Sequence, residues 1–253
     1  GTKKDVKLKH ALSMTSGFNG SPLVGGCQLT PALILYNCAK NIHDLRYDIL
    51  RPGNAPGAQY SYGPHGMQVA AAYLEAKDVS IQPGTTPARQ RTFHELFAQH
   101  VTTPLGMTST TWYDPAGSAP TNPWVAGGAY STPPDYAKLL RALLGGAFVT
   151  DMTAFTQPRT TGLPRVFVPS GASNWEYALG SFVECDTPSA CATSMINSAP
   201  GAYGWTGWID RGTGYYGLIA TEISSGGDRK GTELEQEMQG LIEAAIASRV
   251  PAP

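Results

Sequence analysis

Apolar residues recur at helical spacing in several segments of this chain. After Thr132 they stand at i, i+3, i+4, i+7 and i+8, which is the pattern of an amphipathic helix. These positions are Tyr136, Leu139, Leu140, Leu143 and Leu144. Thr132 and Asp135 have the spacing of a capping box, and Pro133 suits the first helical position. The pattern predicts a helix that begins after Thr132 and ends at Gly145.

Four other segments are also predicted to be helical. The helix predicted over residues 5–15 is followed by a stop signal at Gly17, and the helix predicted over residues 66–77 is rich in alanine. Thr92 with Glu95 and Thr232 with Glu235 each have capping-box spacing, so each pair predicts a helix start. The apolar stripe of the last helix consists of Leu234, Met238, Leu241, Ile242 and Ile246.

Strand signals concentrate near the end of the chain. Residues 175–184, 202–209 and 215–223 are aromatic or β-branched, with glycine-rich turns between them. Helices followed by an antiparallel meander and a long amphipathic helix predict an α+β fold, with the last helix covering the sheet. The motif G-x-G-x-x-G at 212–217 precedes a strand, so we interpret it as a hairpin turn. A dinucleotide site would need a helix there.

Composition and charge exclude several classes of protein. The chain has 253 residues, 15% of them charged, and a formal net charge of −1. A nucleic-acid-binding protein needs a basic face, and a polybasic membrane anchor needs a basic cluster. No apolar run approaches the roughly 18 residues of a membrane span. The first ten residues are charged and lack the apolar stretch of a signal peptide.

The four cysteines stand in two close pairs, Cys27 with Cys38 and Cys185 with Cys191. This local spacing suits two loop-closing disulfides, with buried thiols as the alternative. Disulfides would indicate a secreted or periplasmic protein.

Several well-known catalytic and metal motifs are absent. Neither G-x-S-x-G nor a Walker A sequence occurs. HELFAQH at 94–100 superficially resembles a zinc-protease motif, but two ligands on one helical face need a spacing of four. We interpret His94 and His100 as ordinary helix residues. The sequence implies no metal and no organic cofactor.

Six segments, in order along the chain, resemble those of one family. They are Leu8–Gly17 (LKHALSMTSG), Pro56–Tyr62 (PGAQYSY), Pro104–Met107 (PLGM), Ala126–Thr132 (AGGAYST), Tyr177–Gly180 (YALG) and Gly204–Gly207 (GWTG). The chain thereby resembles the serine β-lactamase and penicillin-binding-protein-like hydrolases, close to class C β-lactamases and related esterases. The resemblance implies an antiparallel sheet flanked by helices, plus a mostly helical lobe.

The resemblance also implies site residues. Tyr62 takes the place of the family's tyrosine general base, which acts beside a lysine because free tyrosine has a pKa near 10. Trp205, Thr206 and Gly207 take the place of the strand that lines the substrate pocket. The N–H of Trp208 would donate to the oxyanion.

The sequence departs from the family pattern in three places. No serine is followed by lysine three residues later, so the nucleophile motif S-x-x-K is missing. Pro64 stands where the family often has an asparagine that contacts substrate, and Trp205 stands where a cation often holds a carboxylate. The last two changes favour an ester over an amide or a β-lactam.

We therefore expect one β-lactamase-like domain over residues 1–253 with an incomplete N-terminus. Residues 1–165 would be the mostly helical lobe, and residues 166–253 the C-terminal sheet and helix. The nucleophile would lie on an associated N-terminal chain of the same precursor, produced by a cut before residue 1. The alternatives are a catalytically silent fragment and a non-catalytic binding protein. A carbohydrate-binding module would account for the aromatic residues but not for the ordered helical motifs.

Overall fold

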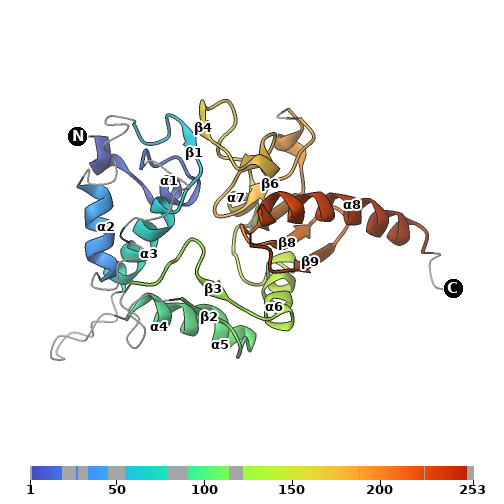
Figure 1. Ribbon diagram of the computed structural model, residues 1–253, viewed down its shortest axis with the longest axis horizontal. Helices are drawn as coiled ribbons and strands as arrows, with labels where there is room; N and C mark the ends of the chain where they lie inside the picture. The colour runs from blue at the N-terminus through green and yellow to red at the C-terminus, as the bar shows by residue number, and fades with distance from the viewer. Residues whose placement is uncertain are drawn as a thin grey trace. The chain divides into compact units, whose positions relative to one another are not determined.

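The structure is a computed structural model, which describes residues 2–18, 27, 34–44, 55–78, 91–113, 122–187, 189–224 and 226–249 (Figure 1). The chain divides into two compact units. Unit 1 contains residues 1–139 and 159–168, and unit 2 contains residues 140–158 and 169–253. The predicted α+β fold is confirmed by the helices and the five-stranded antiparallel sheet.

Helices dominate unit 1. They are η1 (Thr2–Asp5), α1 (Leu8–Leu12), α2 (Leu35–His43), α3 (His65–Lys77), α4 (Phe93–Phe97), the π-helical turn η3 (Ala98–Thr102) and α5 (Thr103–Leu105). Helix α3 packs against both α1 and α2, and Figure 1 shows α2 and α3 side by side. The capping box of Thr92 is confirmed, because Thr92 N donates to Glu95 Oε2 at 2.8 Å and Thr92 Oγ1 accepts from Glu95 N.

Two short strand pairs complete unit 1. Strand β1 (Tyr60–Ser61) runs parallel to β4 (Arg165–Phe167), and β2 (Thr111–Trp112) runs antiparallel to β3 (Ala129–Tyr130). Helix α6 (Pro133–Leu144) begins in this unit and passes into unit 2. Its Asp135 carboxylate accepts from Ser109 N at 2.7 Å and from Thr110 Oγ1 at 3.1 Å. The start of α6 is thereby joined to the segment that precedes β2.

Unit 2 is built on a five-stranded antiparallel sheet in the order β5-β6-β7-β8-β9. The strands are β5 (Glu176–Tyr177), β6 (Phe182–Val183), β7 (Ile196–Pro200), β8 (Trp205–Asp210) and β9 (Tyr215–Ala220). The smaller helices are α7 (Met152–Thr156), η4 (Ser170–Ala172) and η5 (Ala190–Thr193). Helix α8 (Gly227–Ala247) contacts β7, β8 and β9, so the prediction that the last helix covers the sheet is confirmed.

Three details of the late elements differ from the sequence prediction. Residues 175–184 form a hairpin and not one strand, because the chain reverses at Gly180, where φ is +92°. Strand β7 was not predicted. Helix α8 begins at Gly227 and not at Thr232, so the Thr232–Glu235 capping box is wrong. Thr232 Oγ1 instead donates to the carbonyl of Asp228 at 2.9 Å, one turn back in the same helix.

Both predicted disulfides are present. Cys27 pairs with Cys38 and Cys185 with Cys191, with Cα–Cα distances of 5.1 and 5.0 Å. Cys27 and Cys38 lie fully buried in a cluster with Phe18 and Ile42. Among the described residues, no helix is both long and apolar enough to cross a membrane.

Helix α8 approaches the sheet closely at Gly231, and this contact allows a test of the packing. A Cβ added there would lie 2.2 Å from Thr206 Oγ1, whereas one added at Gly240 would meet no atom within 4 Å. We expect Gly231→Ala to destabilise the fold by about 1–3 kcal/mol through overpacking. Gly240→Ala should stabilise it by about 0.5–1 kcal/mol through helix propensity. Urea unfolding measures both, and a Gly231→Ala variant as stable as the wild type would contradict this packing.

Candidate functional site

Tyr62 lies in unit 1 between the end of β1 and the start of α3. Its backbone N–H donates to the carbonyl of Phe167 at 3.0 Å, which continues the β1–β4 pairing by one residue. Its side chain is partly exposed, while Ser61 and Gly63 on either side are buried. A tyrosine fixed at its backbone and partly open at its side chain is suited to contact another molecule.

The segment that contains Tyr62 is also held by the buried loop at 13–18. The carbonyl of Met14 accepts from Ser61 N at 3.1 Å, and the carbonyl of Thr15 accepts from Gly57 N at 2.7 Å. Among the described residues, Met14 is the one non-glycine residue with positive φ, at 59°. Such a backbone conformation is costly for methionine and occurs more often near functional sites. Two of the family-like segments, Leu8–Gly17 and Pro56–Tyr62, are therefore in direct contact.

Pro64 immediately precedes α3 and is partly exposed. It is the N-cap residue of that helix, with φ −77° and ψ −20°, and its carbonyl accepts from Gln68 N at 3.2 Å. Proline has no side-chain amide, so Pro64 offers a substrate only an apolar ring and its carbonyl. Pro64 and Tyr62 are thus neighbours at one end of α3.

The other predicted site residues belong to strand β8 of unit 2. Because side chains alternate along a strand, Thr206 and Trp208 share one face and Trp205 points to the other. Thr206 is fully buried and packs against Gly231 of α8. Gly207 is buried between Ala199 of β7 and Leu218 of β9. Trp205, at the start of the strand, is the one partly exposed member of the predicted triplet.

Trp208 is 1% exposed, and its ring lies over Gly217 of β9. A Cβ at Gly217 would come within 2.0 Å of Trp208 Cζ2. The register places Trp208 opposite Ser198 on one side and opposite Gly217 on the other. An oxyanion donor has to point its N–H into open space, whereas β8 has a neighbouring strand on both sides here. The predicted role of this amide therefore requires a local opening of the ladder, and it stays a prediction.

A buried acidic pair under α8 was not predicted from the sequence. Glu235 of α8 is 0% exposed, and Glu184, just after β6, is 6% exposed. Burial, followed by the charge of Glu184, raises the pKa of Glu235 to about 11. Burial also raises the pKa of Glu184. Gln239 Nε2 donates to Glu184 Oε2 at 3.0 Å. At neutral pH the pair therefore holds a proton.

The sequence contained one signal of this pair. Gly227, Gly231 and Glu235 follow each other at intervals of four, so they lie on one face of a helix that starts at Gly227. Two glycines on that face allow the helix backbone to approach the sheet closely. The residue at the next position of the same face, Glu235, is then buried. Interpreting Glu235 as a capping residue concealed this pattern.

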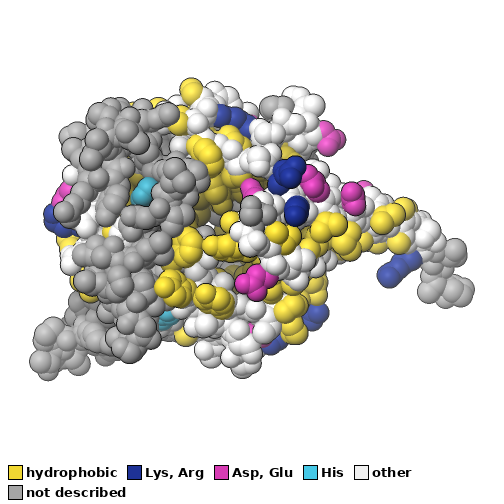
Figure 2. Space-filling model, in the orientation of Figure 1, with side chains coloured by type: hydrophobic (Ala, Val, Ile, Leu, Met, Phe, Trp, Pro, Cys, Tyr) yellow, Lys and Arg dark blue, Asp and Glu magenta, His cyan; other side chains and the backbone are white. Residues whose placement is uncertain are grey.

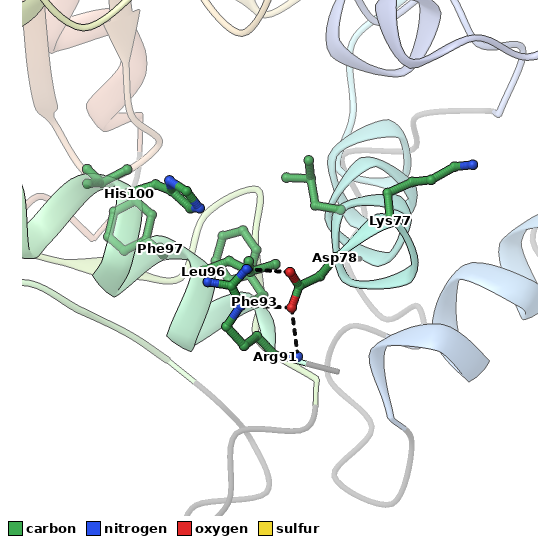
Figure 3. A pocket seen from close by; sticks show the side chains of 9 residues that line it. Lys77, Asp78, Arg91, Phe93, Leu96, Phe97 and His100 are labelled. Carbon is green, nitrogen blue, oxygen red and sulfur yellow. Dashed lines mark hydrogen bonds and ion pairs between the residues drawn. The ribbon is translucent and has the colours of Figure 1, made fainter. Parts of the chain in front are cut away.

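An open pocket of about 640 Å³ lies in unit 1 between the end of α3 and the segment formed by α4 and η3 (Figure 3). It is lined by Leu74, Lys77, Asp78, Arg91, Phe93, Leu96, Phe97, His100 and Val101. Arg91 Nε donates to Asp78 Oδ2 at 2.8 Å, so the two charges at its edge neutralise each other. None of the predicted site residues lines this pocket, and we assign it no role in the chemistry.

Comparison with known proteins identifies the family. A family profile described as Beta-lactamase matches residues 1–230, which is most of the chain. The chain belongs to the beta-lactamase family. A search of curated protein sequences found no match.

Solved structures of the beta-lactamase fold are similar to this chain at low sequence identity. A Bacteroides dorei protein assigned provisionally to the beta-lactamases is 20% identical, with a TM-score of 0.70 over 95% of this chain and 73% of that one. EstCE1, a hydrolase with promiscuous acyltransferase activity, is 16% identical, with a TM-score of 0.60 over 90% and 70%. Simvastatin synthase (LovD) from Aspergillus terreus is 16% identical, with a TM-score of 0.59 over 95% and 68%. At these identities the similarity shows the fold.

Proposed function

We propose that this beta-lactamase-family chain is part of a serine hydrolase that cleaves an ester through an acyl-enzyme. The observation that carries the proposal is the placement of Tyr62, which is partly exposed beside α3 and fixed by hydrogen bonds of its own backbone and of Ser61. The proposal is supported by the similarity of the fold to EstCE1, which is described as a hydrolase with promiscuous acyltransferase activity.

The nucleophile has to come from outside these residues, because no serine in the chain has a lysine three positions later. We propose that an N-terminal chain of the same precursor supplies the serine and the lysine. Tyr62, as phenolate beside that lysine, takes the proton of the serine hydroxyl while the serine oxygen bonds to the ester carbonyl carbon. The proton then passes to the leaving alcohol as its C–O bond breaks. Water releases the acyl group in the same way, with Tyr62 again accepting a proton.

The preference for an ester follows from two residues. Pro64 has no side-chain donor or acceptor for an acyl-amide group, and Trp205 has no charge to hold a substrate carboxylate. Trp205 is partly exposed and would instead contact an apolar acyl or alcohol group. In this proposal Thr206 and Gly207 belong to the buried strand behind the pocket, and Trp208 N–H donates to the oxyanion once the strand ladder opens locally. Amides and β-lactams would be poorer substrates.

The proposal is tested on protein purified from its source and treated with a serine-acylating phosphonate. Denaturing mass spectrometry should then show the 26.8 kDa chain unmodified. It should also show a second polypeptide that has gained one phosphonyl group. If the spectrum shows the unmodified chain and no labelled polypeptide, the hydrolase proposal is wrong.

A second candidate function is a binding protein that uses the same fold without catalysis. The absence of S-x-x-K favours it directly, since a fold without its nucleophile can still bind a ligand. The two candidates differ in one property that can be measured, which is the presence of a phosphonate-reactive serine in the purified material.

We further propose that the protein works outside the cytoplasm, in a secreted or periplasmic location. The two disulfides support this, because such bonds persist in oxidising compartments.

A further inference from the structure

The pocket at the end of α3 has a rigid aromatic wall. Phe93 and Phe97 of α4 stack with their ring centroids 6.0 Å apart. Trp112 of β2 packs edge-on against both rings, at centroid distances of 5.1 and 5.3 Å. Phe93 is buried and Phe97 is partly exposed. Because Trp112 holds both rings in place, this wall is already formed before an apolar ligand arrives.

The rest of the pocket is also apolar and large enough for a small organic molecule. Leu74, in the last turns of α3, is 45% exposed although its side chain is apolar. Val101 of the facing segment belongs to the π-helical turn η3, and such turns occur frequently at functional sites. The volume of about 640 Å³ falls within the range of roughly 300–1,000 Å³ that small-molecule sites occupy.

The ion pair at the edge of the pocket leaves a cation accessible and its carboxylate covered. Asp78 has a side chain that is 3% exposed, and its oxygens accept from the backbone N, Nε and Nη2 of Arg91. Arg91 is 29% exposed, and this pair uses two of the five N–H groups of its guanidinium. The other three, two on Nη1 and one on Nη2, lie along the adjacent edge of the group. A second carboxylate can therefore approach Arg91 end-on.

Two other polar residues line the pocket, and they add no negative charge. The ammonium of Lys77 lies 5.8 Å from the ring centroid of Tyr73, so this residue contributes mainly its aliphatic chain to the pocket. Figure 3 shows Lys77 extending away from the pair of Asp78 and Arg91. His100 is exposed and offers at least one ring N–H.

Two carboxyl groups near the pocket are engaged with the start of α4. Glu75 Oε1 accepts from Phe93 N at 2.6 Å, and Glu95 Oε2 accepts from Thr92 N at 2.8 Å. Neither glutamate is among the described residues that line the pocket. A negatively charged group that enters the pocket would therefore meet the guanidinium of Arg91 first.

We propose that this pocket binds a small carboxylic acid, with its apolar body against Phe93 and Phe97 and its carboxylate on Arg91. Arginine and carboxylate form parallel charge-assisted hydrogen bonds, which are stronger than those between neutral groups. Asp78 already holds the guanidinium in place, so little side-chain entropy is lost when the acid binds. None of the residues predicted for catalysis lines this pocket, and the inference does not depend on the proposed function.

The test is titration calorimetry with 4-phenylbutyrate and with 4-phenylbutanol, which share an apolar body and differ in the carboxylate. The tagged protein is purified from the source organism and first treated with the serine-acylating phosphonate, so that an active-site serine is blocked. Decanoate serves as a second acid with an aliphatic body. Binding to the blocked protein then reports on a site away from the reacting serine.

Three variants locate the site. Leu74→Glu places a negative charge in the pocket. Tyr73→Glu is its matched control, because Tyr73 is 47% exposed on the same helix and does not line the pocket. Arg91→Lys keeps a positive charge beside Asp78 and removes the second edge of the guanidinium. All three side chains are at least partly exposed, so the variants should keep the wild-type circular dichroism.

We expect wild type and Tyr73→Glu to bind 4-phenylbutyrate with dissociation constants that agree within about twofold, and Leu74→Glu to bind it about tenfold more weakly. The alcohol should bind wild type about tenfold more weakly than the acid, and Arg91→Lys should lose this preference. Wild-type affinity in Leu74→Glu would overturn the assignment to this pocket. Equal binding of acid and alcohol by the wild type would overturn the assignment of a carboxylate. If neither 4-phenylbutyrate nor decanoate binds the wild type, the inference is wrong, and the proposed function is unaffected.

Discussion

Replacing Tyr62 with phenylalanine is expected to lower kcat/KM for an aryl ester by about 10²–10⁴-fold, the contribution typical of a general base. The substitution removes the phenolic oxygen and leaves the ring. The backbone hydrogen bond from Tyr62 N to Phe167 is unaffected, because it involves no side-chain atom. The rate is measured on the assembled protein, by release of the aryl alcohol.

Tyr73→Phe is the matched control for this prediction. Tyr73 is 47% exposed on α3, so its hydroxyl lies at the surface. That variant should retain wild-type activity. A Tyr62→Phe enzyme that also keeps full activity, with unchanged phosphonate labelling, would remove Tyr62 from the proposed mechanism. Loss of labelling together with loss of turnover would instead place Tyr62 in activation of the serine.

Replacing Glu235 with glutamine is expected to stabilise the protein at pH 8 by about 2–4 kcal/mol. The pKa of Glu235 is raised to about 11 by burial and by Glu184, against an ordinary value of 4.5. In the folded protein this carboxyl stays protonated at pH 8, whereas in the unfolded chain it loses its proton. Unfolding therefore releases a proton, and this favours unfolding more strongly as the pH rises. Glutamine keeps a similar shape but does not titrate.

The pH range over which the stability changes follows from the raised pKa of Glu235. The stability contributed by the protonated group is fully present below pH 4.5 and is lost progressively as the pH rises towards 11. Glu184, whose pKa is also raised by burial, acts in the same direction, and Asp210 and Tyr215 are the other titratable groups near the pair. Urea unfolding of wild type and Glu235→Gln at pH 5, 6.5 and 8 should give curves that diverge with pH. Glu237→Gln, at an exposed position of α8, should run parallel to wild type. If the Glu235→Gln curve also runs parallel to it, Glu235 is not protonated in the fold.

The sequence predicted those elements whose signals are local. The stripe after Thr132 and the capping box at Thr92 depend on residues three or four apart, and α6 and α4 begin where these signals stand. The cysteine pairs were equally local, with 11 and 6 residues between partners, and both disulfides are present. The family resemblance came from six short segments, each of at most ten consecutive residues.

The elements that could not be predicted depend on contacts between distant residues. Strand β7 contains Asn197, Ser198 and Pro200, which have weak strand propensity, and it forms because β6 and β8 lie on either side. Helix α8 starts five residues before the predicted position because Gly227 and Gly231 fit closely against Gly204 and Thr206, at the start of β8. The burial of Thr206, which we had predicted to line a pocket, results from the same contact. Tyr62 could be placed before α3 from sequence, but the hydrogen bond from its neighbour Ser61 to the carbonyl of Met14 required the structure.

The close fit of α8 also determines how the chain behaves when it is alone. Gly227 and Gly231 lie against Gly204 and Thr206, and in this arrangement Leu234, Met238 and Leu241 of α8 are exposed. Figure 2 shows hydrophobic side chains along this helix. The apolar side chains stay in water until another molecule covers them. A chain produced alone would therefore be folded and still prone to aggregate through these exposed side chains.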